Sequence, residues 1–488
     1  MHLGDLARDL TLDPVTADIT ITGLSADSRR IEPGFLFAAL AGAKVDGARF
    51  VAAAIEAGAV AVLAAEDAGL PDDLAVPVLR TEDPRRQLAL MAARFYAAQP
   101  GATVAVTGTA GKTSVATFTR QIWQQAGYDA ASLGTLGVTT AEGTQYGSLT
   151  TPDTVGLHET LAELAGEGIT HLAMEASSHG IDQRRLDGVR LKAAAFTNLG
   201  RDHLDYHADL EDYFAAKLRL FTTLLPDDGT VVVDADEPYA DRVAAVAGER
   251  GLPLFTIGRA GMGLRLTDLA EESAGQRLTI EAGGETYTVL LPLIGRFQVS
   301  NALISAGLAI VTGTPVAVSL AALEHLQGAP GRLDLVGRTE NGAPCFVDYA
   351  HKPDALANVL AALRPHVAGR LVVVFGAGGD RDPGKRAIMG EIAARDADVV
   401  IVTDDNPRSE DPARIRAAIM AAAPGAKEIG DRHQAIAEAV AMLQAGDVLV
   451  VAGKGHETGQ IVGDQVLPFS DHEEVRAALA RSASGGGR

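Results

Sequence analysis

The fold is decided by one stretch of the chain, Ala102-Thr103-Val104-Ala105-Val106, followed by Thr107-Gly108-Thr109-Ala110-Gly111-Lys112-Thr113 and a helix-like segment at residues 114–125. The apolar run predicts a buried strand, and the glycines predict a tight turn before the helix. Such a turn lets successive backbone N–H groups point at one anion, and the helix N-terminus adds partial positive charge there. We therefore predict that residues 108–113 bind the phosphates of ATP.

The last two residues of this loop carry side chains that suit a nucleotide. Lys112 would neutralise phosphate charge, and the hydroxyl of Thr113 would ligate a Mg²⁺ ion that bridges two phosphate oxygens. The usual spacing G-x-x-x-x-G-K-T has a glycine where this chain has Val106, so the loop is a variant. The alternative is a turn that binds nothing, although turn chemistry alone does not call for Lys-Thr at the start of a helix.

Length and charge narrow the class of protein. The 488 residues exceed what one hydrophobic core usually supports, so about three domains are expected. A hydrophobic content of 47% with 22% charged residues is typical of a globular chain. The formal net charge of -21 opposes non-specific binding to nucleic acid or to an anionic membrane, and we expect neither as a partner.

The cysteine usage and the N-terminus indicate where the protein works. The one cysteine, Cys345, lies in an apolar run, which suits a buried strand residue in a reducing compartment better than a nucleophile. The N-terminus has no basic segment with an apolar core, and no apolar stretch is long enough to cross a bilayer. We expect a cytoplasmic protein and a monomer.

Helical patterns alternate with short Val/Ile/Ala-rich strands, which predicts an α/β fold with parallel sheets covered by helices. Pro/Gly breaks at residues 99–101 and 328–331 divide the chain into three predicted domains. Residues 1–99 form a smaller α/β domain, residues 100–330 a central P-loop type ATP-binding domain, and residues 331–488 a Rossmann-like C-terminal domain.

In the central domain, acidic and histidine residues follow two predicted strands. Glu175 ends the run from residue 171, and its carboxylate could hold Mg²⁺ against phosphate or could simply be a solvated acid at a strand end. His203 and His207 lie four residues apart, a spacing that on a helix would also suit zinc. The chain lacks the His-Glu-x-x-His pattern and a nearby cysteine ligand there, so we do not expect zinc.

Lys217 allows two interpretations. On its own sequence context it is a helical lysine whose ammonium group reaches water. The alternative is a desolvated lysine with a lowered pKa, whose neutral amine captures carbon dioxide as a carbamate and becomes a metal-binding anion. The local sequence favours the first interpretation.

Three apolar strands of the C-terminal domain end in polar loops that can share one crevice. Arg381 and Arg408 suit carboxylates, whereas Asp405 and Glu457 suit ammonium groups, so the loops predict an amino-acid pocket. The alternative is that these charges only solvate surface loops. A nicotinamide cofactor is disfavoured, because Arg381 stands where the dinucleotide fingerprint needs its third glycine.

Together these motifs closely resemble the Mur ligases, the ATP-dependent amide-forming enzymes of peptidoglycan precursor synthesis. The resemblance spans nearly the whole chain and rests on eight ordered motifs, at residues 108–113, 175–180, 197–206, 295–301, 348–351, 379–382, 405–408 and 453–457. It implies a γ-phosphoryl transfer from ATP that turns a carboxylate into an acyl phosphate, which an amine then attacks.

The resemblance also implies a role for individual residues. ATP would be held by Gly108, Thr109, Ala110, Gly111, Lys112, Thr113, Asn301 at adenine, Arg332 at the phosphates and Asp348 at the ribose. The metal site would comprise Thr113, Glu175, His203 and Lys217, with Lys217 at the position of the carbamylated lysine of the family, which reverses the preference given above. Lys112, Lys217, His203 and Glu175 would act in catalysis. Many members have asparagine where this chain has Ala110 and Gln298.

The substrates follow from the same resemblance. The UDP-N-acetylmuramoyl-L-alanyl-D-glutamate would contact Ser28 at its uridine end and Thr150, Thr151, Ser177 and Arg185 at its peptide. The amino-acid pocket would comprise Arg381, Asp405, Asn406, Pro407, Arg408, Gly453 and Glu457. The sequence Asp-Asn-Pro-Arg at residues 405–408 is similar to the signature of members that add meso-diaminopimelate, whose extra carboxylate would pair with the guanidinium fork of Arg408.

Three other interpretations remain open at this point. Folylpolyglutamate synthetases share the fold and chemistry, although the loop at residues 405–408 favours a diamino acid. A P-loop kinase or transport ATPase would use ATP without forming an amide. A nucleotide-binding regulator would bind ATP without turnover.

Overall fold

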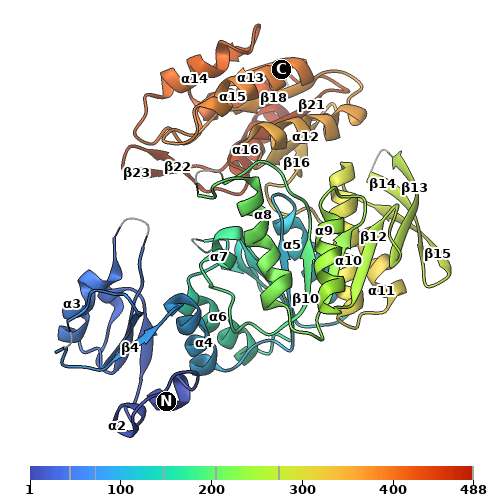
Figure 1. Cartoon of the computed structure of the whole chain (residues 1–488). Coiled ribbons are helices and arrows are strands. Elements are labelled where there is room, and N and C mark those ends of the chain that lie inside the picture. The colour runs from blue at the N-terminus through green and yellow to red at the C-terminus, as the bar shows by residue number, and fades with distance from the viewer. Residues whose placement is uncertain are drawn as a thin grey trace. The chain divides into compact units, whose positions relative to one another are not determined.

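The computed structural model describes residues 1–42, 45–71, 73–145, 147, 149–203, 206–272 and 275–485. Contacts divide the chain into two compact units, which we describe separately. Unit 1 comprises residues 1–267, 279–287 and 300–323, and unit 2 comprises residues 268–278, 288–299 and 324–488. Both are built of helices and mainly parallel strands, so the predicted α/β class is confirmed (Figure 1).

Unit 1 begins with a small parallel sheet, drawn in blue in Figure 1. Its order is β1 (Gly23–Ser25), β2 (Phe35–Ala39), β3 (Ala61–Ala65) and β4 (Val78–Thr81). The helices of this segment are α1 (Leu3–Leu6), α2 (Pro14–Ala17), α3 (Val51–Glu56) and α4 (Pro84–Tyr96). Leu36 and Leu63 of the sheet share a buried core with Leu88 and Met91 of α4. The amphipathic face of α4 therefore covers one side of this sheet.

The second sheet has eleven strands in the order β15-β14-β13-β12-β11-β10-β5-β9-β6-β7-β8. Their bounds are β5 (Ala102–Thr107), β6 (Ala130–Gly134), β7 (Gly137–Thr139), β8 (Thr144–Gln145), β9 (His171–Glu175), β10 (Leu191–Phe196), β11 (Thr230–Asp234), β12 (Leu254–Gly258), β13 (Leu264–Glu272), β14 (Gly275–Ala282) and β15 (Glu285–Leu291). β5 pairs in parallel with β9 on one side and β10 on the other. Both faces of β5 are covered, which explains its nearly continuous apolar run.

The helices that follow these strands are α5 (Lys112–Gln125), α6 (Thr154–Gly166), α7 (Ser178–Asp182), α8 (Leu210–Arg219), α9 (Ala240–Arg250), α10 (Arg296–Val311) and α11 (Val316–Ala322). The buried core on one side of the sheet joins Leu157 and Leu161 of α6 to Leu172 and Met174 of β9. Because β5, β9 and β10 are parallel neighbours, their carboxyl ends meet at one edge, where the predicted phosphate loop begins.

Unit 2 contains a six-stranded sheet in the order β16 (Asp334–Arg338), β17 (Pro344–Asp348), β21 (Val448–Ala452), β18 (Leu371–Phe375), β19 (Val399–Val402) and β20 (Lys427–Glu428). Only the edge pair β16–β17 of this sheet is antiparallel. The sheet is packed by α12 (Pro353–Leu363), α13 (Gly384–Asp396), α14 (Pro412–Met420), α15 (Arg432–Ala441) and α16 (Asp471–Gly485). A two-stranded hairpin, β22 (Gly459–Val462) and β23 (Gln465–Pro468), follows β21.

Two further expectations can be compared with the structure. Cys345 is buried in β17, as predicted, and burial raises the pKa of its thiol to about 12. Across the part of the chain that the structure describes, no helix is long and apolar enough to cross a membrane.

His158 of α6 is a buried histidine whose surroundings favour its neutral form. Its side chain is 1% exposed, and its Nε2 donates to the backbone oxygen of Asp187 at 3.0 Å. Burial lowers the pKa of His158 to about 4. In the unfolded chain the imidazole of His158 takes up a proton below about pH 6.5, whereas in the folded chain it does so only at about pH 4. The folded state therefore loses stability relative to the unfolded state as the pH falls between those two values.

We expect His158→Gln to make the protein less sensitive to acid, because the Gln amide can still donate to Asp187 but does not titrate. Urea unfolding at pH 7 and pH 5 should show wild type losing about 2 kcal/mol more than the variant over this interval. The exposed His325→Gln is the control and should follow wild type. An equal loss in wild type and His158→Gln would contradict the prediction.

Candidate active site

The predicted strand, loop and helix at residues 102–125 are confirmed. β5 ends at Thr107, and α5 begins at Lys112 with Gly111 as its N-terminal cap. Gly108 and Gly111 have positive φ values of +148° and +87°. A Cβ built on Gly108 would overlap the hydroxyl of Thr197, and one built on Gly111 would overlap the side-chain oxygen of Asn301. Both positions therefore require glycine, for backbone angle and for space.

The loop after β10 supports this turn. The backbone N–H of Ala110 donates to Oδ1 of Asn198 at 2.9 Å, and the N–H of Thr109 donates to the Asn198 backbone oxygen at 2.9 Å. The Thr197 hydroxyl donates to the Ala110 backbone oxygen at 2.6 Å. The two loops are held together because β5 and β10 are neighbours in a parallel sheet.

Two lysines meet at one carbonyl of the loop. Nζ of Lys112 donates to the backbone oxygens of Gly108 at 2.8 Å and Thr109 at 3.0 Å. Nζ of Lys217, from α8, donates to the same Gly108 oxygen at 2.8 Å and lies 4.2 Å from the ring centre of Tyr213. Lys217 is 1% exposed, so the interpretation of it as a lysine that reaches water is wrong. Thr113 is buried at the start of α5.

Glu175 lies at the end of β9 and is 2% exposed. Its carboxylate accepts from the backbone N–H of Thr135 at 2.7 Å and from the Thr135 hydroxyl at 3.2 Å. Thr135 follows β6, and the rule that found Glu175, a polar residue at a strand end, would have found it too. Among the described residues, no cationic side chain pairs with Glu175. Because a buried carboxylate needs a compensating charge, the carboxylate of Glu175 is suited to bind a metal ion.

Residues predicted to hold the peptide substrate gather beside Glu175. The hydroxyl of Thr150 is hydrogen-bonded to that of Thr135 at 3.1 Å, and the hydroxyl of Thr151 donates to the Glu175 backbone oxygen at 3.1 Å. The Thr151 and Ser177 hydroxyls are 3.0 Å apart, and Arg185 donates to the Thr151 backbone oxygen at 2.7 Å. The sequence separates these positions, but the end of β9 brings them together.

His203 lies in a cluster of rings near α7 and α8. Its ring centre is 4.9 Å from that of His179 and 5.9 Å from that of Tyr213. His203 has a positive φ of +53°, which is uncommon for a non-glycine residue and typical of constrained functional loops. Within the described ranges, no three His, Cys, Asp or Glu side chains are grouped as a metal site, and Leu204 and Asp205 of the 197–206 motif lie outside those ranges.

The other residues that are predicted to contact ATP belong to different units. Asn301 is buried in the unit 1 part of α10, whereas Arg332 and Asp348 belong to unit 2. Asp348 ends β17 and accepts from the backbone N–H groups of Leu333 at 2.6 Å and Ala350 at 2.7 Å. Burial raises the pKa of Asp348 to about 6. The guanidinium of Arg332 lies 4.7 Å from the ring centre of Tyr349.

The predicted amino-acid pocket is built from the loops after β19 and β21. Asp405, Asn406 and Pro407 are buried, and Arg408 is half-buried with a φ of +53°. The Arg408 side chain donates to the backbone oxygen of Gly379 at 2.9 Å, and the backbone N–H of Arg408 donates to the backbone oxygen of Ile461 at 3.0 Å. A Cβ on Gly453 would lie 2.6 Å from Oδ2 of Asp405, so this loop also needs its glycine.

Two residues of this pocket, Asn406 and Glu457, form a hydrogen-bonded group with the neighbouring Lys454 in unit 2. Asn406 donates to Glu457 at 2.9 Å, and Lys454 donates to Asn406 at 2.9 Å. β19 and β21 both pair with β18, one on each side, which explains why the loops after them meet although they are distant in sequence. Arg381 is exposed in the loop after β18.

Ser28, the predicted uridine contact, is half-buried in the single turn Ser28–Arg30 of the N-terminal segment. Asp27 caps this turn by accepting from the Arg29 backbone N–H at 3.0 Å. The local structure is thus a turn capped by Asp27.

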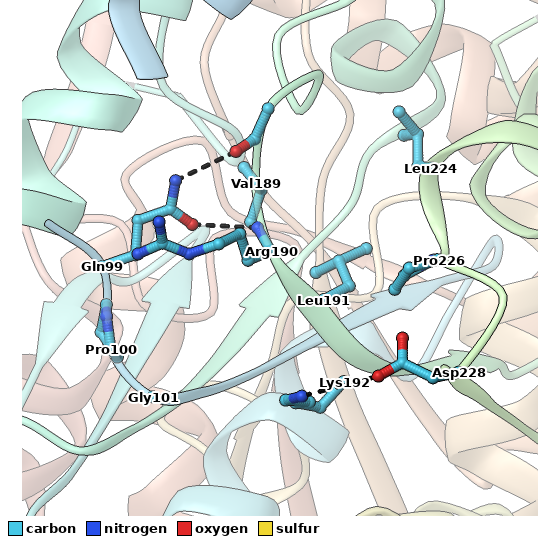
Figure 2. Close-up of a pocket in the computed structure, with 11 residues that line it drawn as sticks. Gln99, Pro100, Gly101, Val189, Arg190, Leu191, Lys192, Leu224, Pro226 and Asp228 are labelled. Atoms are coloured by element: carbon cyan, nitrogen blue, oxygen red, sulfur yellow. Dashed lines mark hydrogen bonds and ion pairs between the residues drawn. The ribbon is translucent and has the colours of Figure 1, made fainter. Parts of the chain in front are cut away.

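A separate pocket of about 570 Å³ lies at the opposite edge of the central sheet, where β5 and β10 begin (Figure 2). The side chain of Gln99 bridges this edge by donating to the Gly188 oxygen at 3.0 Å and accepting from the Arg190 N–H at 2.9 Å. None of the predicted site residues lines this pocket.

Comparison with known proteins agrees with this architecture. The Mur ligase middle domain matches residues 106–309, the Mur ligase glutamate ligase domain residues 331–455, and the Mur ligase family catalytic domain residues 20–96. Three domain types in one α/β chain define the class of enzyme, a multidomain ligase.

Curated relatives cover the chain almost completely. The UDP-N-acetylmuramoyl-L-alanyl-D-glutamate--2,6-diaminopimelate ligase of Mesorhizobium japonicum is 62% identical over 99% of this chain and 100% of its own length. The ligase of the same name from Brucella melitensis is 59% identical over 98% of each chain. The chain therefore belongs to the Mur ligase family.

Solved structures show the same fold. One of a UDP-N-acetylmuramoyl-L-alanyl-D-glutamate--2,6-diaminopimelate ligase is 33% identical, with a TM-score of 0.73 and 99% of both chains covered. A Mycobacterium tuberculosis folylpolyglutamate synthase complexed with ADP is 17% identical, with a TM-score of 0.63, 82% of this chain and 94% of that chain covered. The second likeness concerns the fold alone.

Gly111 and Gly127 offer a matched test of the loop geometry. Both flank α5 with nearly equal φ values of +87° and +88°, but a Cβ on Gly127 meets nothing within 4 Å. We expect Gly127→Ala to cost about 1 kcal/mol of backbone strain. Gly111→Ala should cost roughly 1–3 kcal/mol more, because its methyl group overlaps Asn301. Urea unfolding of both variants measures this difference, and equal losses would show that the loop yields without strain.

Proposed function

We propose that this protein is an ATP-dependent ligase that joins meso-diaminopimelate to the D-glutamate γ-carboxylate of UDP-N-acetylmuramoyl-L-alanyl-D-glutamate. The observation that carries the proposal is the 62% identity, over 99% of the chain, with a relative of that name. The glycine-dependent loop at residues 108–113 and the charged loops of unit 2 support it. We further propose that the protein acts in the cytoplasm as a monomer.

The chemistry requires an activated carboxylate. A carboxylate resists an amine because its negative charge repels the nucleophile and oxide is a poor leaving group. Transfer of the γ-phosphoryl group of ATP to the γ-carboxylate gives an acyl phosphate and ADP, and the amine then displaces phosphate to form the amide. The protein contributes positioning and charge stabilisation to both steps.

We assign the nucleotide to the loop at residues 108–113, with Asn301, Arg332 and Asp348 at its other contacts. The N–H groups of the loop and Lys112 would stabilise charge on the phosphates. Thr113, Glu175, His203 and Lys217 would hold Mg²⁺, which when bound offsets charge between the two anions. The buried carboxylate of Glu175 fits this role, since its hydrogen bonds from Thr135 leave lone pairs available.

The burial of Lys217 favours its proposed carbamate. A carbamate forms on a lysine amine that is shielded from water, and Lys217 is 1% exposed beside the phosphate loop. After the ammonium group loses a proton, the neutral amine would add carbon dioxide and lose a second proton, and the resulting carbamate anion suits a ligand or a positioning group for a metal ion.

We assign the peptide substrate to Thr150, Thr151, Ser177 and Arg185, and its uridine end to Ser28. We assign the incoming amino acid to Arg381, Asp405, Asn406, Pro407, Arg408, Gly453 and Glu457. Arg408 would select meso-diaminopimelate over lysine, because its guanidinium fork binds the additional carboxylate and would be left unpaired by lysine.

The proposal is tested by following phosphate release with the uridine dipeptide, with and without meso-diaminopimelate or lysine, and by mass spectrometry of the product. We expect turnover only when both the dipeptide and meso-diaminopimelate are present, with one amide formed for each phosphate released. Turnover without the dipeptide would favour a kinase or ATPase, and equal use of lysine would refute the proposed specificity.

The role of Arg408 is tested with Arg408→Lys, which keeps the charge but loses the fork. We expect the KM for meso-diaminopimelate to rise about tenfold or more, while the KM for ATP stays within about twofold. Arg414→Ala, an exposed change on α14, is the control. Unchanged KM values for Arg408→Lys would remove Arg408 from the specificity site.

A further inference from the structure

Lys454 is a fully buried lysine that none of the roles above explains. It follows Gly453 after β21, and its side chain is 0% exposed. Its Nζ donates to Oδ1 of Asn406 at 2.9 Å and to Oε2 of Glu457 at 3.2 Å, and it lies 3.9 Å from Oδ1 of Asp405. Since its side chain is fully buried, Lys454 does not face a substrate directly, and its polar partners among the described residues are Asn406, Glu457 and Asp405.

These contacts fix the orientation of the Asn406 amide. Oδ1 accepts from Nζ of Lys454 and from the backbone N–H of Ile461 at 3.0 Å. Nδ2 donates to Oε2 of Glu457 at 2.9 Å. A flipped amide would place Nδ2 against two donors and Oδ1 against a carboxylate, so only one orientation satisfies every group.

The same contacts orient Glu457. Its Oε2 is held by both Lys454 and Asn406, whereas its Oε1 accepts no hydrogen bond from the residues that the structure describes. The Glu457 side chain is 33% exposed, so this oxygen can meet an incoming ammonium group. Lys454 thus holds one side of the carboxylate and leaves the other side available.

A buried lysine is costly, because removing its charge from water costs several kcal/mol unless partners compensate. Here two carboxylates and one amide compensate it. An apolar side chain would fill the space at lower cost, but it would leave the amide oxygen of Asn406 and the Glu457 carboxylate without this donor. The charged amine of Lys454 therefore determines how the side chains of Asn406 and Glu457 are held.

We propose that Lys454 is a positioning residue that orients Asn406 and Glu457 for the ammonium group of the incoming amino acid. The inference rests on the proposed function, because it takes the loops after β19 and β21 to be the amino-acid pocket. It deepens that function by separating two tasks. Arg408 would select the carboxylate of the substrate, and Lys454 would prepare the acidic group Glu457 for its amine.

The test compares Lys454→Met and Glu457→Gln singly and together, in the full-length protein. Lys454→Met should raise the KM for meso-diaminopimelate about tenfold, with the KM for ATP within about twofold of wild type. If Lys454 acts through Glu457, Lys454→Met should add little to the KM effect already present in Glu457→Gln. Lys427→Met, an exposed lysine of β20, is the matched control and should behave as wild type.

Several results of these measurements would refute a positioning role for Lys454. Additive KM effects, or an unchanged KM for meso-diaminopimelate in folded Lys454→Met, would refute the proposal. If Lys454→Met does not fold, the cycle is repeated with Lys454→Gln, whose amide can donate to Asn406 but loses the charge that pairs with Glu457, so a smaller rise of the KM for meso-diaminopimelate is expected and an unchanged KM would refute the proposal. Failure of both variants to fold would assign Lys454 to the stability of the fold and overturn the inference. Failure of wild type to use meso-diaminopimelate would instead refute the proposed function.

Discussion

Hydrogen bonds between the loop after β5 and the loop after β10 hold the candidate phosphate site in shape. Asn198 accepts from the backbone N–H groups of Thr109 and Ala110, and Thr197 donates to the Ala110 oxygen. A glycine-rich loop gains little from its own side chains, so its conformation depends on these neighbours. The neighbouring loop is available because β5 and β10 are adjacent parallel strands, and their carboxyl ends leave the sheet at one edge.

Buried charged side chains recur around the predicted functional loops. Lys217 contacts the loop after β5, Glu175 lies at the end of β9, and Lys454 connects the loops of unit 2. Charges are rarely buried without partners, because desolvation is costly. In unit 2 the partners are present within the chain, whereas Glu175 has only neutral donors among the described residues. This difference indicates that Lys454 holds the protein's own loops, whereas Glu175 is suited to a bound cation.

A second buried pair supports the loops of unit 2. Arg432 and Asp471 are both 0% exposed and form two hydrogen bonds of 2.7 Å. Arg432 also donates to the backbone oxygen of Ala452 at 3.0 Å and to that of Asp404 at 3.3 Å. These two carbonyls lie just before the loops that carry Gly453 and Asp405. The pair therefore connects the ends of β19 and β21.

Elements with local signals could be predicted from the sequence: the strand, loop and helix at residues 102–125, the α/β class, and the polar residues at strand ends such as Glu175. The tertiary structure alone decided that Lys217 is buried, that Thr135 contacts Glu175, and that β21 lies between β17 and β18. The physical reason is that turn chemistry and hydrophobic periodicity act over a few neighbouring residues. Burial and strand order instead depend on which distant segments pack together, and a helical lysine has the same local pattern whether it faces water or a phosphate loop.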